Sequence, residues 1–256
     1  SCKHMQVMTE ETIRIFIGYD DRIPVASSVL MHSITARSSK PVSFTLLNLR
    51  QLQEAKLYWR EVNPLQSTQF SFSRFLTPYL SGYEGWSIFM DNDMILLDDI
   101  AKLWDLRDDK YSVMCVKHSH EPKEEEKFLG AAQTKYEKKN WSSVMLFNNA
   151  KCKALTPEYA NEATGLQLHQ FKWLESDDLI GEIPQRWNYL ADYTELDKRP
   201  ALVHYTTGGP FYPKFKDTEF SEEWFEEFYN SNYCEEADLF KLKEISFEKL
   251  NKDKVA

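Results

Sequence analysis

Apolar residues fall into short runs along the chain, and polar segments separate them. Several of these runs are rich in β-branched and aromatic residues, which is typical of buried strands. They lie within residues 13–20, 42–47, 111–116, 140–149 and 201–205. Between them, segments beginning at Pro24, Leu49 and Phe70 carry apolar residues at helical spacing. Strands that alternate with helices predict an α/β fold around a mostly parallel sheet.

One apolar run, at 88–96, is interrupted by Asp91, Asn92 and Asp93. Side chains of an extended chain alternate between two faces, so both aspartates are expected to point the same way and to share a divalent cation. A solvated turn is the alternative interpretation. Burial of two like charges is costly without a cation or a proton, which favours a Mg²⁺ or Mn²⁺ site that binds a nucleotide diphosphate.

The end of the first predicted strand is a second candidate, because ligands of open α/β sheets bind beyond the carboxyl ends of strands. Gly18 would let the backbone come close to a base or ribose, and Asp20 or Asp21 would accept hydrogen bonds from it. An ordinary strand-to-helix turn explains the same residues equally well.

Arg74 and His204 are further candidates for the same site. Arg74 lies off the apolar stripe of its predicted helix, where it would either bind a phosphate or sugar hydroxyl or simply cover the surface. His204 ends the predicted strand at 201–205. It is a third metal ligand if Asp91 and Asp93 lie within reach, and otherwise a hydrogen-bonded core residue.

Two polar segments are candidates for contacts with the ligand. The loop at 206–210 contains two consecutive glycines, and its amides are suited to surround a pyrophosphate. Residues 175–178 include three acids at the start of a predicted helix. Helix capping explains only one of them, so the surplus indicates a role in binding or catalysis.

The segment 118–139 is highly charged and predicts an exposed loop, which we interpret as a lid over an acceptor. His118 and His120 lack a third ligand nearby, so a polar loop is favoured over a zinc site. Ser221 is expected to cap a helix with aromatic residues along one side, and 239–250 predicts another helix.

Composition and charge narrow the possible partners. The net charge is −9, and the sequence has no stripe of basic residues. Both observations argue against nucleic acid as a partner and against a polybasic membrane anchor. The 4 cysteines lack zinc spacing and favour a reduced, cytoplasmic chain. No run approaches the ~20 apolar residues of a membrane span, although peripheral membrane contact stays open.

Three segments are expected along the 256 residues. Residues 1–12 are interpreted as a cloning remnant and an N-terminal tail, and 13–218 as the main domain. Residues 219–256 are interpreted as a helical C-terminal extension.

Short motifs in order resemble the retaining glycosyltransferases of family 8, which include glycogenin and bacterial lipopolysaccharide galactosyltransferases. The resemblance covers roughly residues 13 to 215 and is more specific than any single motif. The motifs are GYDD at 18–21, Arg74, FMDND at 89–93, QRWNY at 185–189 and VHY at 203–205.

The resemblance implies a GT-A fold, with a mixed and mostly parallel central sheet flanked by helices. It also implies a UDP-sugar donor, Mn²⁺ or Mg²⁺, and a glycan, lipid-linked or protein hydroxyl as acceptor. By position, Asp91, Asp93 and His204 match the metal ligands. The residues that match donor contacts are Gly18, Tyr19, Asp20, Arg74, Asn92, Gly208 and Gly209. Asp177 and Asp178 fall where the family has acidic and amide residues beside the transferred sugar.

Three departures from the family pattern affect these expectations. Trp141, Ser142 and Ser143 replace the family's Asn-Ala-Gly, so contacts to the acceptor are expected to differ. The phosphate loop Gly-X-X-Lys is absent, which leaves Lys214 as a shifted substitute. Asp177 stands where the family has an amide, so the catalytic assignment of Asp177 and Asp178 stays open.

Two rival functions remain at this point. An apolar strand that ends in Asp-X-Asp also begins the haloacid dehalogenase signature, in which the first aspartate is a nucleophile. That motif ordinarily lies on the first strand, whereas α/β structure precedes it here. The second rival is a domain that binds a nucleotide sugar without turning it over.

Overall fold

The computed structural model describes residues 12–62, 68–119, 137–235 and Lys252. In this part of the chain, a sheet of six strands has the order β2-β1-β3-β6-β5-β7. Its strands are β1 (Ile13–Gly18), β2 (Val42–Leu47), β3 (Trp86–Met90), β5 (Val113–Cys115), β6 (Val144–Asn148) and β7 (Ile180–Glu182). Only β6 runs against its neighbours, β3 and β5. The prediction of a mixed, mostly parallel sheet is therefore confirmed.

A second, smaller sheet has the strand order β4-β9-β8. Its strands are β4 (Met94–Leu96), β8 (Tyr189–Leu190) and β9 (Leu202–His204). β3 ends at Met90, so Asp91 follows the end of a buried strand as expected, and the chain passes into this other sheet at Met94. β4 and β9 are antiparallel, with Met94 opposite His204.

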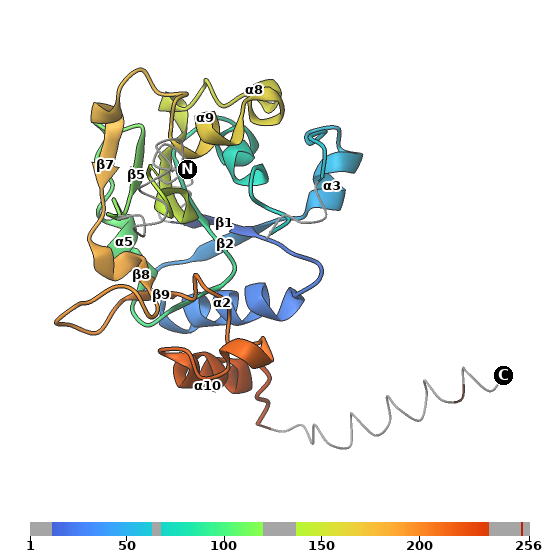
Figure 1. Cartoon of the computed structure of the whole chain (residues 1–256), viewed down its shortest axis with the longest axis vertical. Helices are drawn as coiled ribbons and strands as arrows, with labels where there is room; N and C mark the ends of the chain where they lie inside the picture. The colour runs from blue at the N-terminus through green and yellow to red at the C-terminus, as the bar shows by residue number, and fades with distance from the viewer. Residues whose placement is uncertain (1–11, 63–67, 120–136, 236–251, 253–256) are drawn as a thin grey trace, which may run out of the picture.

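Helices cover both faces of the central sheet (Figure 1). The first face is covered by α2 (Pro24–Arg37), which begins with proline in its first turn, as expected. The opposite face is covered by the 3₁₀ turn η1 (Ser73–Leu76), α4 (Thr77–Leu80), α8 (Pro157–Glu162) and α9 (Gly165–His169). Two further short helices are α3 (Leu49–Glu54) and α5 (Ile100–Trp104).

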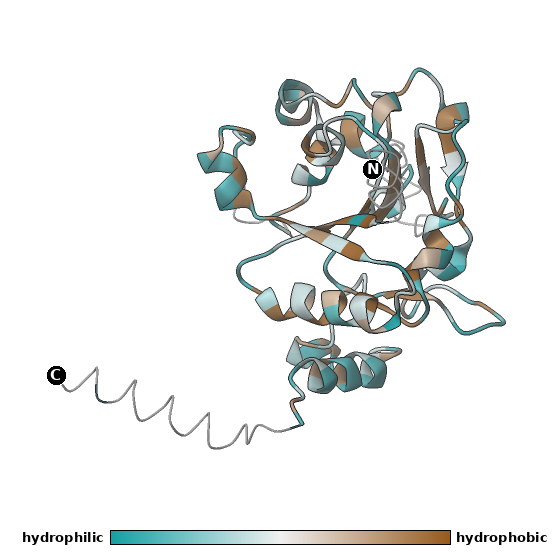
Figure 2. Cartoon of the chain, turned by 180° about the vertical axis from the view of Figure 1, so that it is seen from behind, coloured by the Kyte–Doolittle hydropathy of each residue, from teal (hydrophilic) through white to brown (hydrophobic). Residues whose placement is uncertain are grey.

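Residues of β1 alternate between the two faces and so contribute to two separate cores. Ile15 packs with Leu30 of α2, whereas Phe16 packs with Phe75 on the other face. Strands buried on both faces are typical of parallel sheets, because crossover helices cover each side. Figure 2 shows the central strands as largely hydrophobic and the outermost helix as largely hydrophilic.

That outermost helix, α10 (Ser221–Ser231), packs against α2 rather than against the sheet (Figure 1). Trp224 is 2% exposed, and the buried Glu227 lies 2.8 Å from Arg37 Nη1. The first helix expected in the C-terminal segment is therefore present, and it packs on α2. Ser221 does not cap it, because Phe220 precedes the helix with a left-handed backbone and no side-chain cap.

Some predicted elements differ from the structure. The helix expected at 175–180 is a 3₁₀ turn, η4 (Asp177–Leu179), because the chain joins the sheet as β7 from Ile180 onward. The helix expected over 49–59 ends at Glu54. The segment 183–190 forms a 3₁₀ turn, η5 (Gln185–Trp187), before β8. Other 3₁₀ turns are η2 (Trp141–Ser143), η3 (Asn149–Lys151) and η6 (Pro213–Phe215).

Two sequence predictions fall largely outside the described residues. Most of the charged lid at 118–139 and the second C-terminal helix at 239–250 lie there. Within the described residues, no helix has the length and apolar character needed to cross a membrane.

Candidate functional site

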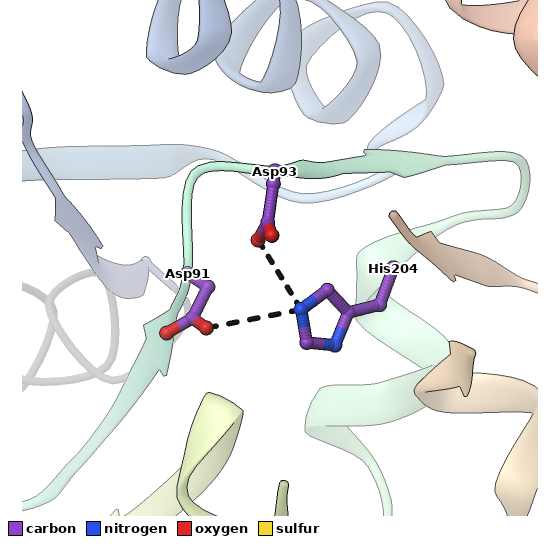
Figure 3. A group of neighbouring side chains, drawn as sticks. All are labelled: Asp91, Asp93 and His204. Carbon is purple, nitrogen blue, oxygen red and sulfur yellow. Dashed lines mark ion pairs between the residues drawn. The ribbon is translucent and has the colours of Figure 1, made fainter. Parts of the chain in front are cut away.

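Asp91, Asp93 and His204 form a compact cluster in which the imidazole faces both carboxylates (Figure 3). One possible ligand atom from each residue lies within 4.8 Å of the others. Nε2 of His204 lies 3.2 Å from Asp93 Oδ1 and 3.8 Å from Asp91 Oδ2. The three residues predicted as metal ligands are thus brought together from two sheets.

The break between β3 and β4 creates this arrangement. Asp91 follows β3 directly, and its backbone N–H donates to the Ser143 carbonyl at 2.9 Å. Asp93 precedes β4, and its carbonyl accepts from the Tyr205 N–H at 2.9 Å. Backbone hydrogen bonds to the residue before β6 and to the residue after β9 therefore fix the two aspartates, while the residue between them lies in a bend.

Asn188, which is fully buried, orients the imidazole of His204. Its Oδ1 lies 3.1 Å from His204 Nδ1, while its Nδ2 donates to Ser143 Oγ at 2.8 Å. Because the amide oxygen must accept, Nδ1 carries a proton, and in the neutral imidazole the lone pair is on Nε2. That lone pair points toward the carboxylates, as in metal-binding histidines held by a neighbouring polar group.

The electrostatics of the cluster favour a cation. Burial, partly offset by Arg74, raises the pKa of Asp91 to about 6, and the charge of Asp93 adds to the rise. Burial opposes protonation of His204, but the carboxylates of Asp93 and Asp91 outweigh it and raise the pKa of the imidazole. A divalent cation would relieve the repulsion between the two carboxylates directly.

Unsatisfied oxygen atoms support the same conclusion. Asp91 Oδ1 and Asp93 Oδ1 are buried and lack a hydrogen bond. Arg74 Nη1 lies 2.8 Å from Asp91 Oδ1, so this contact is an ion pair that is not aligned as a hydrogen bond. Two carboxylates and one neutral imidazole suit Mn²⁺ or Mg²⁺, which prefer oxygen-rich ligand sets. The residues present therefore fit a divalent cation.

The cluster lines a cavity of about 320 Å³. The residues predicted to bind the donor that also line this cavity are Asp20, Arg74, Asn92, Gly208 and Gly209. Asp20 is already held by an ion pair of 2.6 Å to Arg22. Arg74 does not cover the surface: it is 5% exposed, and its Nη1 donates to the Ser142 carbonyl at 2.8 Å.

Other predicted residues do not line this cavity, namely Gly18, Tyr19, Asp177, Asp178 and Lys214. A Cβ at Gly18 would lie 2.4 Å from the Phe70 ring, so the glycine accommodates core packing. Lys214 Nζ lies 5.5 Å from the centre of the Phe215 ring.

The two predicted catalytic acids lie on η4, away from the metal cluster's cavity. Asp177 Oδ1 accepts a hydrogen bond of 3.0 Å from Lys138 Nζ, and its side chain is 63% exposed. Asp178 is also exposed, and its backbone N–H is capped by Ser176 Oγ. A role for either residue in chemistry stays a prediction.

Several site residues were not found by sequence reasoning. Asn140, His169 and Tyr212 line the cavity, and Asn188 orients His204. Asn188 belongs to the QRWNY motif, so its position was noted without a role. The other three lie on loops or on a short helix, where no local pattern indicates a ligand contact.

Solved structures of glycosyltransferases share this fold. WbbM, a bifunctional glycosyltransferase, aligns with a TM-score of 0.61 at 14% identity over 85% of this chain and 50% of WbbM. GlyE of Streptococcus pneumoniae TIGR4 aligns with a TM-score of 0.56 at 15% identity over 84% of this chain and 60% of GlyE. The chain thus spans only half to three fifths of these two structures.

The galactosyltransferase LgtC, solved with donor and acceptor sugar analogs, aligns over nearly its whole length. Its TM-score is 0.57 at 12% identity, over 88% of this chain and 98% of LgtC. At such low identities the similarity shows the fold alone, which is of the GT-A type. The class of protein is therefore a GT-A-like α/β domain with a candidate metal site.

No protein-family model matches the chain. Protein CDI of Arabidopsis thaliana is 49% identical over 238 residues, which cover 90% of this chain and 92% of that protein. The chain therefore belongs to the family of Protein CDI. Membership of glycosyltransferase family 8 stays a prediction.

Proposed function

We propose that the chain is a metal-dependent, retaining glycosyltransferase that moves a hexose or pentose from a UDP-sugar to a hydroxyl group. The acceptor would be a glycan, a lipid-linked molecule or a protein. The observation that carries the proposal is the cluster of Asp91, Asp93 and His204, whose buried carboxylate oxygens lack hydrogen bonds inside a cavity of about 320 Å³.

The three clustered residues would hold Mn²⁺ or Mg²⁺. Such a cation neutralises negative charge on a departing diphosphate, which is ordinarily the largest catalytic term in this class of reaction. A unit charge about 4 Å away is worth about 4 kcal/mol at an effective dielectric of 20. Arg74, which pairs with Asp91 and lines the same cavity, would share this task.

The order of strands suggests how a donor would lie along the sheet edge. Asp20 follows β1, Asp91 follows the adjacent β3, and Ser142 precedes β6 on the other side of β3. If a cation beside Asp91 held the diphosphate, the nucleoside would lie on the side of β1 and the sugar on the side of β6. Tyr212 and the glycines at 208 and 209 would close the cavity mouth.

The test is a thermal-shift panel of nucleotides and nucleotide sugars with and without Mn²⁺, followed by product analysis with the best donor. A stabilisation by UDP compounds that depends on Mn²⁺ and disappears in Asp93→Ala is expected. Asp105→Ala is a matched control, because the Asp105 side chain is 64% exposed and forms an ion pair with Lys40, at 3.6 Å.

Two outcomes would replace the proposal. Release of phosphate from simple esters without a nucleotide would identify a phosphohydrolase of the haloacid dehalogenase type. Tight binding of UDP and Mn²⁺ without transfer or hydrolysis would identify a nucleotide-sugar-binding domain. The domain limits at 13–218 and 219–256 and the cytoplasmic location stay predictions.

A further inference from the structure

A second cavity, of about 350 Å³, adjoins the metal cavity and shares Asn140 and His169 with it. Its volume falls in the range of about 300 to 1,000 Å³ that is usual for small-molecule sites. Ser142 and Leu166 also line this second cavity. Because β6 lies beside β3, this second cavity lies on the side of the metal cluster away from Asp20.

Ser142 and His169 meet at the boundary of the two cavities. Ser142 Oγ lies 2.7 Å from Nδ1 of His169, and Ser142 is 6% exposed. The ring of His169 is wedged edge-on against Phe75, with ring centres 5.1 Å apart, so its orientation is fixed by packing. The pair is thus a rigid part of the cavity wall.

The protonation of His169 determines what Ser142 offers to a ligand. Burial, together with the charge of Arg74, lowers the pKa of His169 to about 3, and the ring also bonds to the backbone of Ser71. The neutral ring donates its one N–H to that backbone carbonyl, so Nδ1 must accept the hydroxyl proton of Ser142. The lone pairs of Ser142 Oγ then remain to accept from a ligand.

The charges around this cavity are balanced. Lys138, whose side chain is 3% exposed, is neutralised by Asp177 at 3.0 Å and by the Gln170 carbonyl at 2.9 Å. Glu137 and Lys139 add one charge of each sign to the wall. With Asp177 counted beside Lys138, the cavity is surrounded by two charges of each sign. Such surroundings, with a fixed hydrogen-bond acceptor and an apolar Leu166, suit a neutral molecule that has O–H donors and a C–H face.

We propose that this second cavity is a subsite for a neutral sugar ring, in which Ser142, held by His169, accepts a hydrogen bond from a sugar hydroxyl. The inference deepens the proposed transferase function, because the ring would belong either to the donor or to the acceptor. The proposal also distinguishes among sugars. The carboxylate of a uronic acid, or the phosphate of a sugar phosphate, would face a hydroxyl oxygen that has no proton to donate.

Binding of free sugars to the 256-residue chain tests the proposal without nucleotide or metal. Saturation-transfer NMR with neutral hexoses and pentoses is expected to detect binding, whereas the matching uronic acids bind at least several-fold more weakly. Ser142→Ala removes one hydrogen bond to a neutral group and is expected to weaken sugar binding about fivefold. Equal binding of uronic acids and neutral sugars would overturn the proposal.

A second variant does not depend on the buried serine. Leu166 is 40% exposed and lines the cavity, so Leu166→Trp is expected to fill the cavity and abolish sugar binding while the fold is kept. Leu106→Trp is the matched control, because Leu106 is 37% exposed and lies outside this wall. Unchanged sugar binding in Leu166→Trp would also overturn the proposal.

The source of the sugar is decided by nucleotide titrations. If the cavity holds the donor's sugar, Ser142→Ala weakens binding of the UDP-sugar and leaves that of UDP unchanged. If it holds the acceptor, the same change weakens binding of free sugar, with or without UDP, and leaves binding of the UDP-sugar unchanged. Failure of the transferase proposal is distinguishable, since no sugar would then be transferred from any UDP-sugar while free sugar still binds.

Discussion

His204 and Asn188 hold each other in a single orientation, with Nδ1 of the imidazole 3.1 Å from Oδ1 of the amide. The amide cannot turn over, because its Nδ2 donates to Ser143 Oγ at 2.8 Å. Nε2 of His204 is therefore directed at Asp91 and Asp93 before any cation arrives. A preorganised ligand loses less entropy on binding than one that must first be oriented.

Asn188→Leu is expected to weaken Mn²⁺ binding about 10- to 100-fold, as is usual when a neighbour that orients a metal ligand is lost. Isothermal titration calorimetry measures this change. Asn149→Leu is the matched control, because Asn149 is also fully buried and donates to Ser87 Oγ at 3.0 Å, away from the cluster. The control is expected to lower the melting temperature without changing Mn²⁺ affinity. Equal affinities in both variants would contradict the role of Asn188.

The stability of the metal-free chain is expected to fall as the pH rises from about 4 to about 6. The pKa of Asp91 is raised from 3.8 to about 6 by burial, so the folded chain binds a proton that the unfolded chain has released. The raised pKa of His204 acts in the same direction, because its stabilisation is present below the ordinary value of about 6.5 and is lost above the raised one. Thermal melts across this pH range measure the fall.

Two comparisons isolate the cause of this pH dependence. Asp91→Asn is expected to flatten the fall between about pH 4 and 6, because an amide does not titrate. Saturating Mn²⁺ is expected to raise the melting temperature most at the upper end of the range, where both carboxylates are charged. A slope that is identical in wild type and Asp91→Asn would contradict the assignment to this carboxyl group.

The sequence predicted the strands at Ile13–Gly18 and Val42–Leu47 and the meeting of Asp91, Asp93 and His204. It did not predict that the run around Asp91 contributes strands to two sheets. A continuous apolar run has the same pattern whether it forms one strand or two, and only the pairing of β4 with the distant β9 distinguishes them.

The roles of other residues were hidden for a similar reason. Gly18 was interpreted as a site for close ligand approach, but the space beside it is filled by Phe70, which lies far along the chain. Asn188 and His169 act through partners that are distant in sequence, namely His204 and Ser142. The spacing of residues along the sequence shows the periodicity of buried helices and strands, but it holds no information about contacts between residues that are far apart in the chain.

Gly18→Ala is expected to destabilise the chain by about 1 to 3 kcal/mol, because the added Cβ would lie 2.4 Å from the ring of Phe70, which is 1% exposed. Chemical denaturation measures the free energy of unfolding. Phe70→Leu leaves space beside residue 18, so the double variant is expected to lose less than the sum of the single losses. Additive losses would show that the two positions do not compete for space.

The docking of α10 on α2 depends on a buried carboxylate. Glu227 is buried on the inner side of α10, where its carboxylate lies 2.8 Å from Arg37 Nη1 and 3.1 Å from His32 Nδ1. Glu227→Ala leaves Arg37 without this partner and is expected to cost about 1 to 3 kcal/mol of unfolding free energy. Glu222→Ala, on the exposed side of the same helix, is expected to change it by less than about 0.5 kcal/mol.

The same contact decides whether the C-terminal extension is dispensable. A chain that ends at residue 218 would uncover the surface of α2 that α10 covers and would remove Trp224, which packs with Val29. We therefore expect the shortened chain to aggregate or to melt at a lower temperature than the full chain, because an apolar face becomes exposed. Light scattering and thermal melts measure this, and a shortened chain as soluble and as stable as the full one would mean that α10 contributes nothing to the core.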